Sequence, residues 1–352
     1  MKRSVWLFSI FVLMGCGMFA IQRGGGDRVG SARKATETYQ KLTAEGWPET
    51  EYLFGQNAMT DAGIALGRKL FYDENLSADG KVSCGSCHNS YTAFAHVDHK
   101  LSHGVYDREG RRNAPALFNL AWSQSFMWDG AITNLDNQSL SPIASHTEMD
   151  VSLPAYLERV QRDTTYQTLY RQAFPGEAMS LPRLLQAIAQ FELTFISQQS
   201  RYDSMRRHQI AFTKQEQKGY ELYKQYCSDC HKEPLFRSDA FESNGLISNA
   251  RFPDWGRVEI THNPNDSGLF RVPSLRNVEV TYPYMHDGRF ATLSQVLKHY
   301  GLRIFKLQGV YQLKEIVLSP NDRVDLLAFL LTLTDRNFVN IKELQDPRGA
   351  QK

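Results

Sequence analysis

Two copies of the pattern Cys-x-x-Cys-His lie in this chain, at Cys84–His88 and Cys227–His231. In a c-type haem site, two thiols of this pattern bond the haem covalently and the histidine binds the iron from one face. Four of the five cysteines fall in the two motifs. The alternatives are a four-thiolate zinc cage and a dithiol redox pair, neither of which needs a histidine after each pair. The chain is therefore predicted to bind two c-type haems.

The fifth cysteine, Cys16, closes an N-terminal segment that starts Met-Lys-Arg and continues through the apolar run Val5–Met14. A basic start, a short apolar core and a small residue before the cut are typical of a secretory signal. The sequence Leu13-Met14-Gly15-Cys16 resembles the bacterial lipobox, which implies a signal peptide over residues 1–15 and lipidation of Cys16. Acyl chains would hold the protein on a membrane surface. The alternative is an uncleaved anchor helix, although the run is shorter than a membrane span needs. Both place the body outside the cytoplasm.

Helices are predicted to position both motifs. Apolar residues recur at helical spacing over Ala62–Tyr72 and Lys214–Tyr226, each just before a motif. Further helices are predicted over Leu181–Ser197, Leu293–Tyr300 and Asp322–Leu333, and no convincing alternating strand pattern is found. We therefore predict an all-α fold of two cytochrome c-type haem domains with long loops.

The predicted domains cover residues 46–205 and 206–345, after a glycine-containing tether at 16–45. No internal repeat is visible beyond the two haem motifs. The formal net charge is only +2, which argues against a nucleic-acid partner.

A series of short motifs in a fixed order resembles the bacterial di-haem cytochrome c peroxidase family, which includes the MauG-like enzymes. The resemblance runs from about residue 50 to 335. Its motifs are Leu101-Ser-His103-Gly, Arg112-Asn113-Ala-Pro115, Phe126-Met-Trp128-Asp-Gly130, Gln138, Glu148-Met149, Phe270-Arg271-Val-Pro273-Ser-Leu-Arg276-Asn and Thr281-Tyr-Pro283-Tyr-Met285-His286-Asp-Gly288.

The resemblance implies a peroxidatic first haem with His88 as its proximal ligand. Glu148 matches the distal carboxylate, which can take a proton from one peroxide oxygen and return it to the other. Gln138 matches a distal amide that can hydrogen-bond to peroxide or water. Trp128 matches a tryptophan between the two haems that serves as an electron conduit. Without the resemblance, Glu148 would be read as a solvated surface acid and Trp128 as a buried structural residue.

His103 matches the histidine that caps the peroxidatic haem in many oxidised family members. Such a cap must leave before peroxide binds, which implies reductive activation. His96 and His99 lie nearby and are alternatives. MauG-like members have no such cap.

The second haem departs from the conventional peroxidases. His231 is its expected proximal ligand, but the position where those peroxidases carry an axial methionine is Tyr300 here. Tyrosine at this position resembles the MauG-like enzymes, and phenolate ligation would lower the reduction potential. The adjacent His299 and the more distant Met285 are the alternatives.

Two further sets of residues are expected around the haems. Arg271 and Arg276 are candidates for binding haem propionates, because guanidinium groups suit carboxylates at buried sites. Asn113, Thr281 and Pro283 match a calcium site at the domain interface, with amide and carbonyl oxygen ligands.

These expectations lead first to an enzyme that reduces hydrogen peroxide to water with electrons from a small periplasmic cytochrome c or copper protein. The second hypothesis is a MauG-like oxidase that removes electrons from a protein or organic substrate. The third is a non-catalytic electron carrier or redox sensor, against which Glu148 and Gln138 argue. The expected location is the periplasmic side of a bacterial membrane, reached through the lipid anchor. Dimerisation is common in the family, so a homodimer is included among the expected partners.

Overall fold

The computed structural model describes residues 46–246, 253–301, 303–307, 310–314 and 316–349. Helices make up 42% of it and strands 6%, which confirms the predicted all-α class. The predicted signal peptide, Cys16 and the tether up to residue 45 lie outside the described residues. Within the described residues, no helix is long and apolar enough to cross a membrane.

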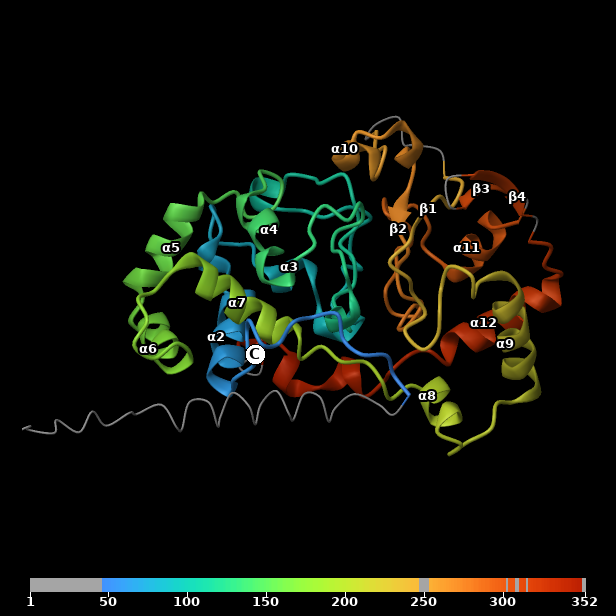
Figure 1. The fold of residues 1–352 in the computed structure, drawn as a ribbon, viewed down its shortest axis with the longest axis horizontal. Helices are drawn as coiled ribbons and strands as arrows, with labels where there is room; N and C mark the ends of the chain where they lie inside the picture. Colours follow the sequence, from blue (N-terminus) through green and yellow to red (C-terminus); the bar gives the residue numbers. More distant parts are fainter. Residues whose placement is uncertain (1–45, 247–252, 302, 308–309, 315, 350–352) are drawn as a thin grey trace, which may run out of the picture.

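The first half of the chain forms a helical lobe around the first haem motif (Figure 1). Its α-helices are α2 (Asp61–Tyr72), α3 (Cys84–Cys87), α4 (Leu140–Ala144), α5 (Leu153–Arg162), α6 (Thr164–Ala173) and α7 (Leu181–Glu192). Helix α2 begins where the Thr60 side chain accepts a hydrogen bond from the Gly63 amide. Helices α2 and α7 can pack closely because Gly67 has no side chain: a Cβ there would lie 1.9 Å from the Ala187 carbonyl oxygen.

The second half forms another helical lobe beside the first (Figure 1). Its α-helices are α8 (Arg201–Arg206), α9 (Lys214–Tyr226), α10 (Val258–Thr261), α11 (Leu293–His299) and α12 (Pro320–Leu331). Strand β1 (Phe241–Glu242) pairs antiparallel with β2 (Phe270–Arg271), and β3 (Arg303–Leu307) pairs antiparallel with β4 (Val310–Lys314). The sequence analysis did not find these strands, because strands this short carry little periodicity.

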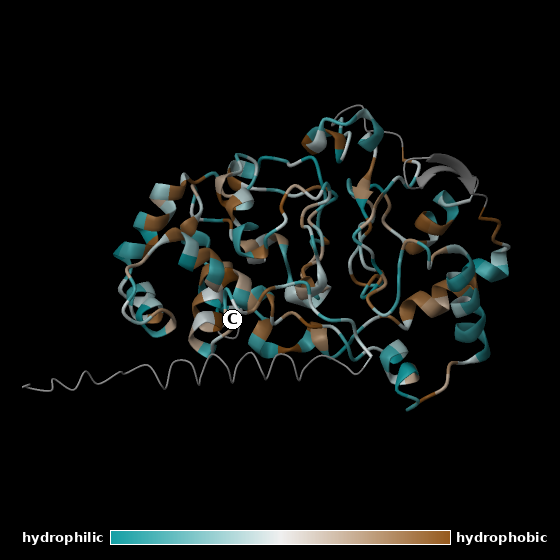
Figure 2. Ribbon diagram, in the orientation of Figure 1, coloured by the Kyte–Doolittle hydropathy of each residue, from teal (hydrophilic) through white to brown (hydrophobic). Residues whose placement is uncertain are grey.

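Short 3₁₀ helices lie within the loops of both lobes. They are η1 (Glu74–Leu76), η2 (Ser90–Thr92), η3 (Val105–Asp107), η4 (Leu120–Trp122), η5 (Leu135–Asn137), η6 (Pro264–Asp266), η7 (Phe338–Asn340) and η8 (Lys342–Leu344). Figure 2 shows apolar and polar residues mixed along the helices of both lobes, as expected for helices with one side against a core.

The two halves repeat one structural plan, which the sequence analysis missed. Gly219 lets α9 approach α12 just as Gly67 lets α2 approach α7: a Cβ on Gly219 would lie 1.9 Å from the Asp325 carbonyl oxygen. The sequence Pro-x-Leu-x-Asn occurs at 115–119 and at 273–277. Both asparagines, Asn119 and Asn277, adopt left-handed backbone angles, with φ of 54° and 57°.

A second repeated element is a tight turn with the pattern aromatic-Met-aromatic-Asp-Gly, at 126–130 and at 284–288, where His286 supplies the second ring. Each turn is closed by one antiparallel bridge, Phe126 to Ile132 and Tyr284 to Phe290. Trp128 and His286 therefore hold equivalent places in the two halves.

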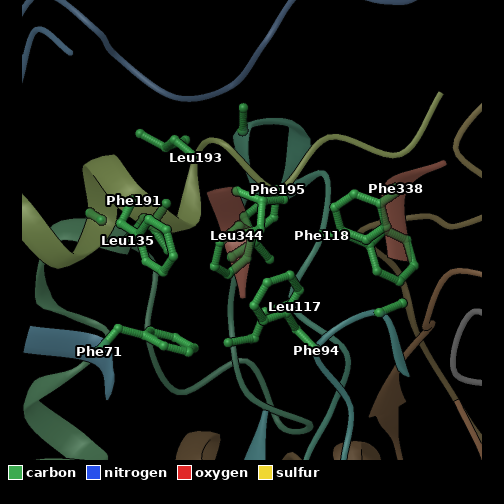
Figure 3. Close-up of a cluster of buried hydrophobic side chains, with 14 of the residues drawn as sticks. Phe71, Phe94, Leu117, Phe118, Leu135, Phe191, Leu193, Phe195, Phe338 and Leu344 are labelled. Carbon is green, nitrogen blue, oxygen red and sulfur yellow. The ribbon is translucent and has the colours of Figure 1, made fainter. Parts of the chain in front are cut away.

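The C-terminal segment returns to the first lobe, where it lies beside α2 (Figure 1). Phe338 and Leu344 join a buried cluster with Phe71, Phe94 and Phe195 (Figure 3). The Tyr72 hydroxyl donates a hydrogen bond to the Leu344 carbonyl at 2.5 Å. The core around the first haem motif therefore includes residues from the far end of the chain.

Candidate active site

The first haem motif is held in a short helix with a fixed histidine. Helix α3 spans the two cysteines, and Ser83 and Ser86 form a capping box at its start. The His88 Nδ1 lies 2.7 Å from the Phe94 carbonyl oxygen. Because a carbonyl can only accept, Nδ1 carries the proton and Nε2 keeps the lone pair that a haem iron needs. Burial lowers the pKa of His88 to about 4, so the imidazole is neutral at neutral pH.

The second motif follows α9, and backbone carbonyls orient its histidine in the same way. The His231 Nδ1 lies 3.0 Å from the Pro273 carbonyl oxygen and 3.3 Å from that of Phe236. Burial lowers the pKa of His231 to about 4. None of the four motif cysteines forms a disulfide within the described residues. In the described part of the chain they do not converge with other side chains as a metal cage, so the arrangement does not match the zinc alternative.

A cavity of about 280 Å³ opens beside the second motif. Cys227, Cys230 and His231 line it, together with Met285 and Tyr300. This donor set suits a covalently attached haem with a protein ligand on each face.

The three candidates for the second ligand of this haem differ in their contacts. Tyr300 lines the cavity, whereas His299 is not among its lining residues and its Nε2 lies 2.8 Å from the Asn244 carbonyl oxygen. Met285 also lines the cavity, and its sulfur accepts a hydrogen bond from the Asn244 amide at 3.1 Å. Burial raises the pKa of Tyr300 above its ordinary value, so a phenolate there would need a nearby positive charge such as an iron.

Three arginines line the same cavity, Arg237, Arg271 and Arg276. The Arg271 Nε donates to the Met127 carbonyl at 3.2 Å, and no carboxylate of the described residues forms an ion pair with Arg271. Burial and the charge of Arg237 lower the pKa of Arg271 to about 10. Arg237 is ion-paired with Asp239 and donates from Nη1 to the Trp122 carbonyl, while its buried Nε has no hydrogen-bond partner among the described residues. Arg271, which has no such ion pair, is therefore the arginine of this cavity best suited to a haem propionate.

Arg237 was missed by the sequence analysis, and Arg276 has a protein partner that the sequence analysis did not foresee. Arg276 is fully buried, and its Nη1 and Nη2 donate to the two carboxylate oxygens of Asp203 at 2.8 and 2.7 Å. Its Nε donates to the Pro234 carbonyl at 2.8 Å. Its guanidinium is thus paired with Asp203, while Arg276 also lines the cavity, so its binding of a propionate stays a prediction. Only the fold could reveal this pairing, because the partner lies 73 residues away in sequence.

On the first-haem side, Glu148 is tied to the loop that carries His103. The Val105 amide donates to the Glu148 carbonyl at 2.8 Å, and a Cβ on Gly104 would lie 2.2 Å from the Thr147 carbonyl oxygen. The Cys87 thiol lies 3.7 Å from the His103 carbonyl oxygen. The first haem motif, His103 and the Glu148 backbone are thus neighbours. Burial raises the pKa of the Glu148 carboxyl.

The three histidines of this loop lie together. The ring centroids of His99 and His103 are 4.4 Å apart, and those of His96 and His99 are 5.4 Å apart. The His103 Nδ1 lies 3.0 Å from Asp107, whereas the Nδ1 of His96 is buried without a hydrogen-bond partner among the described residues. The neighbouring Gln138 donates from Nε2 to the sulfur of Met127 at 3.5 Å.

Trp128 lies where the two halves meet. Its indole Nε1 donates to the Asn113 carbonyl at 2.8 Å, and its own carbonyl accepts from the Arg271 amide at 2.8 Å. It also lines the cavity of the second motif.

The predicted calcium ligands line the same cavity; they are Asn113, Thr281 and Pro283. The Asn113 side chain donates to the Lys100 carbonyl.

Comparison with known proteins gives consistent matches. Residues 61–211 match the family model described as di-haem cytochrome c peroxidase. The chain is 33% identical over 274 residues to cytochrome c551 peroxidase of Nitrosomonas europaea, covering 76% of this chain and 79% of that protein. It is 32% identical over 286 residues to methylamine utilization protein MauG of Methylorubrum extorquens, covering 79% of each.

A solved structure agrees with these relatives. It is a MauG-like protein associated with microbial copper homeostasis, with a TM-score of 0.77 and 30% identity, covering 87% of this chain and 98% of the other. The match extends over both halves, with their two haem motifs. The chain therefore belongs to the di-haem cytochrome c peroxidase family, whose MauG-like branch it also resembles.

Proposed function

We propose that this protein reduces hydrogen peroxide to water with two electrons delivered by a small redox protein. The observation that carries the proposal is the Glu148 carboxyl, whose backbone is bonded to the His103 loop beside the first haem motif. The peroxidase names of relatives such as the one from Nitrosomonas europaea support the same reaction. A non-catalytic carrier would have no need of a proton-transferring group at this place.

Each half of the chain would hold one haem. Cys84, Cys87 and His88 would hold the first haem, and the equivalent residues at 227, 230 and 231 the second. The haems supply the redox chemistry when bound, since their iron can store and pass on single electrons. Trp128, bonded to both halves, would stand in the path between them.

The overall reaction consumes one peroxide, two electrons and two protons and yields two waters. In its ionised form, the Glu148 carboxylate can accept a proton from one peroxide oxygen and deliver it to the other, the leaving oxygen. The Gln138 amide would orient the peroxide by a hydrogen bond. His103 would have to move away first if it caps this site.

Tyr300 would be the second protein ligand of the haem held by His231: it lines the cavity, His299 does not, and the Met285 sulfur, which also lines it, already accepts a hydrogen bond from Asn244. Arg271, Arg276 and Arg237, which line the same cavity, would be the candidates for binding the propionates. Asn113, Thr281 and Pro283 would hold a calcium ion at the interface of the halves. We further propose that lipidated Cys16 anchors the protein on the periplasmic side of a membrane, where the donor would be a small cytochrome c or copper protein. Homodimer formation belongs to the same proposal.

Tyr300 also favours a second candidate function, a MauG-like oxidase acting on a protein or organic substrate. A tyrosine at this position lowers the reduction potential, which suits storing oxidising equivalents rather than rapid turnover. The 32% identity to a MauG protein agrees with this candidate.

The test is the peroxide-dependent oxidation of a pre-reduced small cytochrome c by the haem-loaded protein. We expect Glu148→Gln to lower kcat by about 10²–10⁴-fold, the usual contribution of a positioned acid–base group. The matched control is Glu158→Gln, the same change at an exposed carboxylate of α5. Turnover that survives in Glu148→Gln would contradict the proposal. Absent turnover in the wild type, with peroxide converting the haem spectra into a long-lived oxidised form, would favour the MauG-like oxidase.

A further inference from the structure

Arg112 lies at the centre of a buried polar cluster where the two halves meet. Its Nε and Nη2 donate to both carboxylate oxygens of Asp254, at 2.6 and 2.9 Å. Its Nη1 donates to Asp129 at 2.5 Å. Asp129 is 5% exposed and Asp254 4%. Two buried carboxylates need a compensating cation, so one guanidinium fastens a loop of the first half to a segment of the second.

The cluster is directly connected to Trp128 and to the residue that its indole binds. Asp129 follows Trp128 directly, and Asn113, whose carbonyl accepts the indole N–H, follows Arg112 directly. The Arg112 side chain therefore closes a loop that runs through the Asn113 carbonyl, the indole and the Asp129 carboxylate. This loop fixes the depth and tilt of the ring relative to both halves.

The arrangement is special to the first half. The repeated plan places Phe270 where the first half has Arg112, and Phe270 stacks on His286 with ring centroids 3.8 Å apart. The second-half counterpart of Asp129 is Asp287, which pairs locally with Arg289. A purely structural interface salt bridge would not need to be joined to the turn that carries the tryptophan.

The backbone bonds across the interface act in the same direction. The Arg271 amide donates to the Trp128 carbonyl, and the Asn113 amide donates to the His286 carbonyl at 2.7 Å. These bonds join the backbones of the two turns and do not involve the indole ring. The ring itself is held by its bond to the Asn113 carbonyl, and Arg112 pairs with the residues beside both ends of that bond.

We propose that Arg112 is a positioning residue for Trp128, holding its indole in the orientation that permits electron transfer between the two haem sites. The inference rests on the role of Trp128 in the proposed function. Asp129 and Asp254 are the two anchors through which Arg112 acts. This guanidinium pairs with both carboxylates, and its planar fork can bond the two at once in a fixed geometry, which a single ammonium cannot do.

The test variant is Arg112→Lys, which keeps the charge and loses the fork. Its matched control is Arg111→Lys, the same change at the adjacent arginine, whose partner Glu259 lies nearer the surface. The first readout is the indole N–H signal of Trp128 in ultraviolet resonance Raman, obtained by difference against Trp128→Phe. The second is the rate of electron transfer between the haems after rapid reduction of one of them. We expect Arg112→Lys to weaken the indole hydrogen bond and slow the transfer about tenfold or more, since small misplacements cost this much.

The double variant Arg112→Lys/Trp128→Phe shows whether the arginine acts through the tryptophan. Transfer in it no slower than in Trp128→Phe alone supports the inference, whereas additive losses overturn it. An unchanged indole signal and rate in Arg112→Lys also overturn it. If Trp128→Phe itself does not slow transfer, the conduit of the proposed function fails, which is a distinguishable result. Should Arg112→Lys not fold, Asp254→Asn removes one anchor and is subject to the same expectations.

Discussion

Glu192 offers a sharp test of the energetics inside the first lobe. It is the last residue of α7, only 3% exposed, and forms no ion pair within the described residues. The equivalent position at the end of α12 holds Leu330, one residue after the Phe329 that matches Phe191. The first half therefore buries a carboxyl where the second half buries an aliphatic side chain. Burial raises the pKa of Glu192 to about 8.

The sign of the effect on stability follows from this raised pKa. Between the ordinary pKa of 4.5 and about 8, the folded protein keeps the proton on Glu192 and the unfolded chain releases it. The folded state then binds more protons, so the free energy of unfolding falls as the pH rises through this window and levels off above it. At about 1.4 kcal/mol for each pH unit, the loss over this window is on the order of 5 kcal/mol.

We expect Glu192→Gln to remove this loss, because the amide cannot ionise and has nearly the same shape. Urea unfolding of the haem-loaded protein at pH 5, 7 and 9 measures it. The variant should be progressively more stable than the wild type from pH 5 to pH 9, whereas the exposed Glu158→Gln should follow the wild type throughout. Parallel profiles of Glu192→Gln and wild type would refute the reasoning, since Glu192 would then titrate as an ordinary surface acid.

The remaining predictions concern the second lobe. Arg276→Met should destabilise the protein by about 3–5 kcal/mol in urea unfolding, because it leaves the buried Asp203 carboxylate without its partner. Adding Asp203→Asn should restore part of the lost stability. No recovery would show that the Arg276–Asp203 ion pair does not hold these two segments together. Tyr300→Phe, which removes only the phenol oxygen, should change the absorption spectrum and raise the reduction potential of the second haem in a spectroelectrochemical titration, while the first haem keeps its values. An unchanged second haem would exclude Tyr300 as its ligand.

Some properties of this protein could be predicted from the sequence because they depend on neighbouring residues. The two haem motifs are contiguous, and the helices that precede them, α2 and α9, follow from local apolar spacing. Helix α7 was predicted to continue to Ser197 but ends at Glu192, because Ser197 instead gives its backbone to the side chain of Asn119. The family motifs are short and follow one another in a fixed order along the chain, which is why the family could be expected before the fold was known.

Other properties depend on contacts between distant residues, and no local pattern encodes those. Arg276 and Arg271 look alike in sequence and both line the cavity, yet Arg276 is paired with Asp203, whereas Arg271 forms no ion pair within the described residues. His299 and Tyr300 are adjacent, but a residue turns by about 100° from the next along a helix, so only one of them faces the haem cavity. The sequence therefore specifies the chemistry that is available, through residue types at short spacing. Folding then decides which side chains reach the haem cavity, because the burial, the ion pairs and the orientation of a side chain arise only when remote segments pack together.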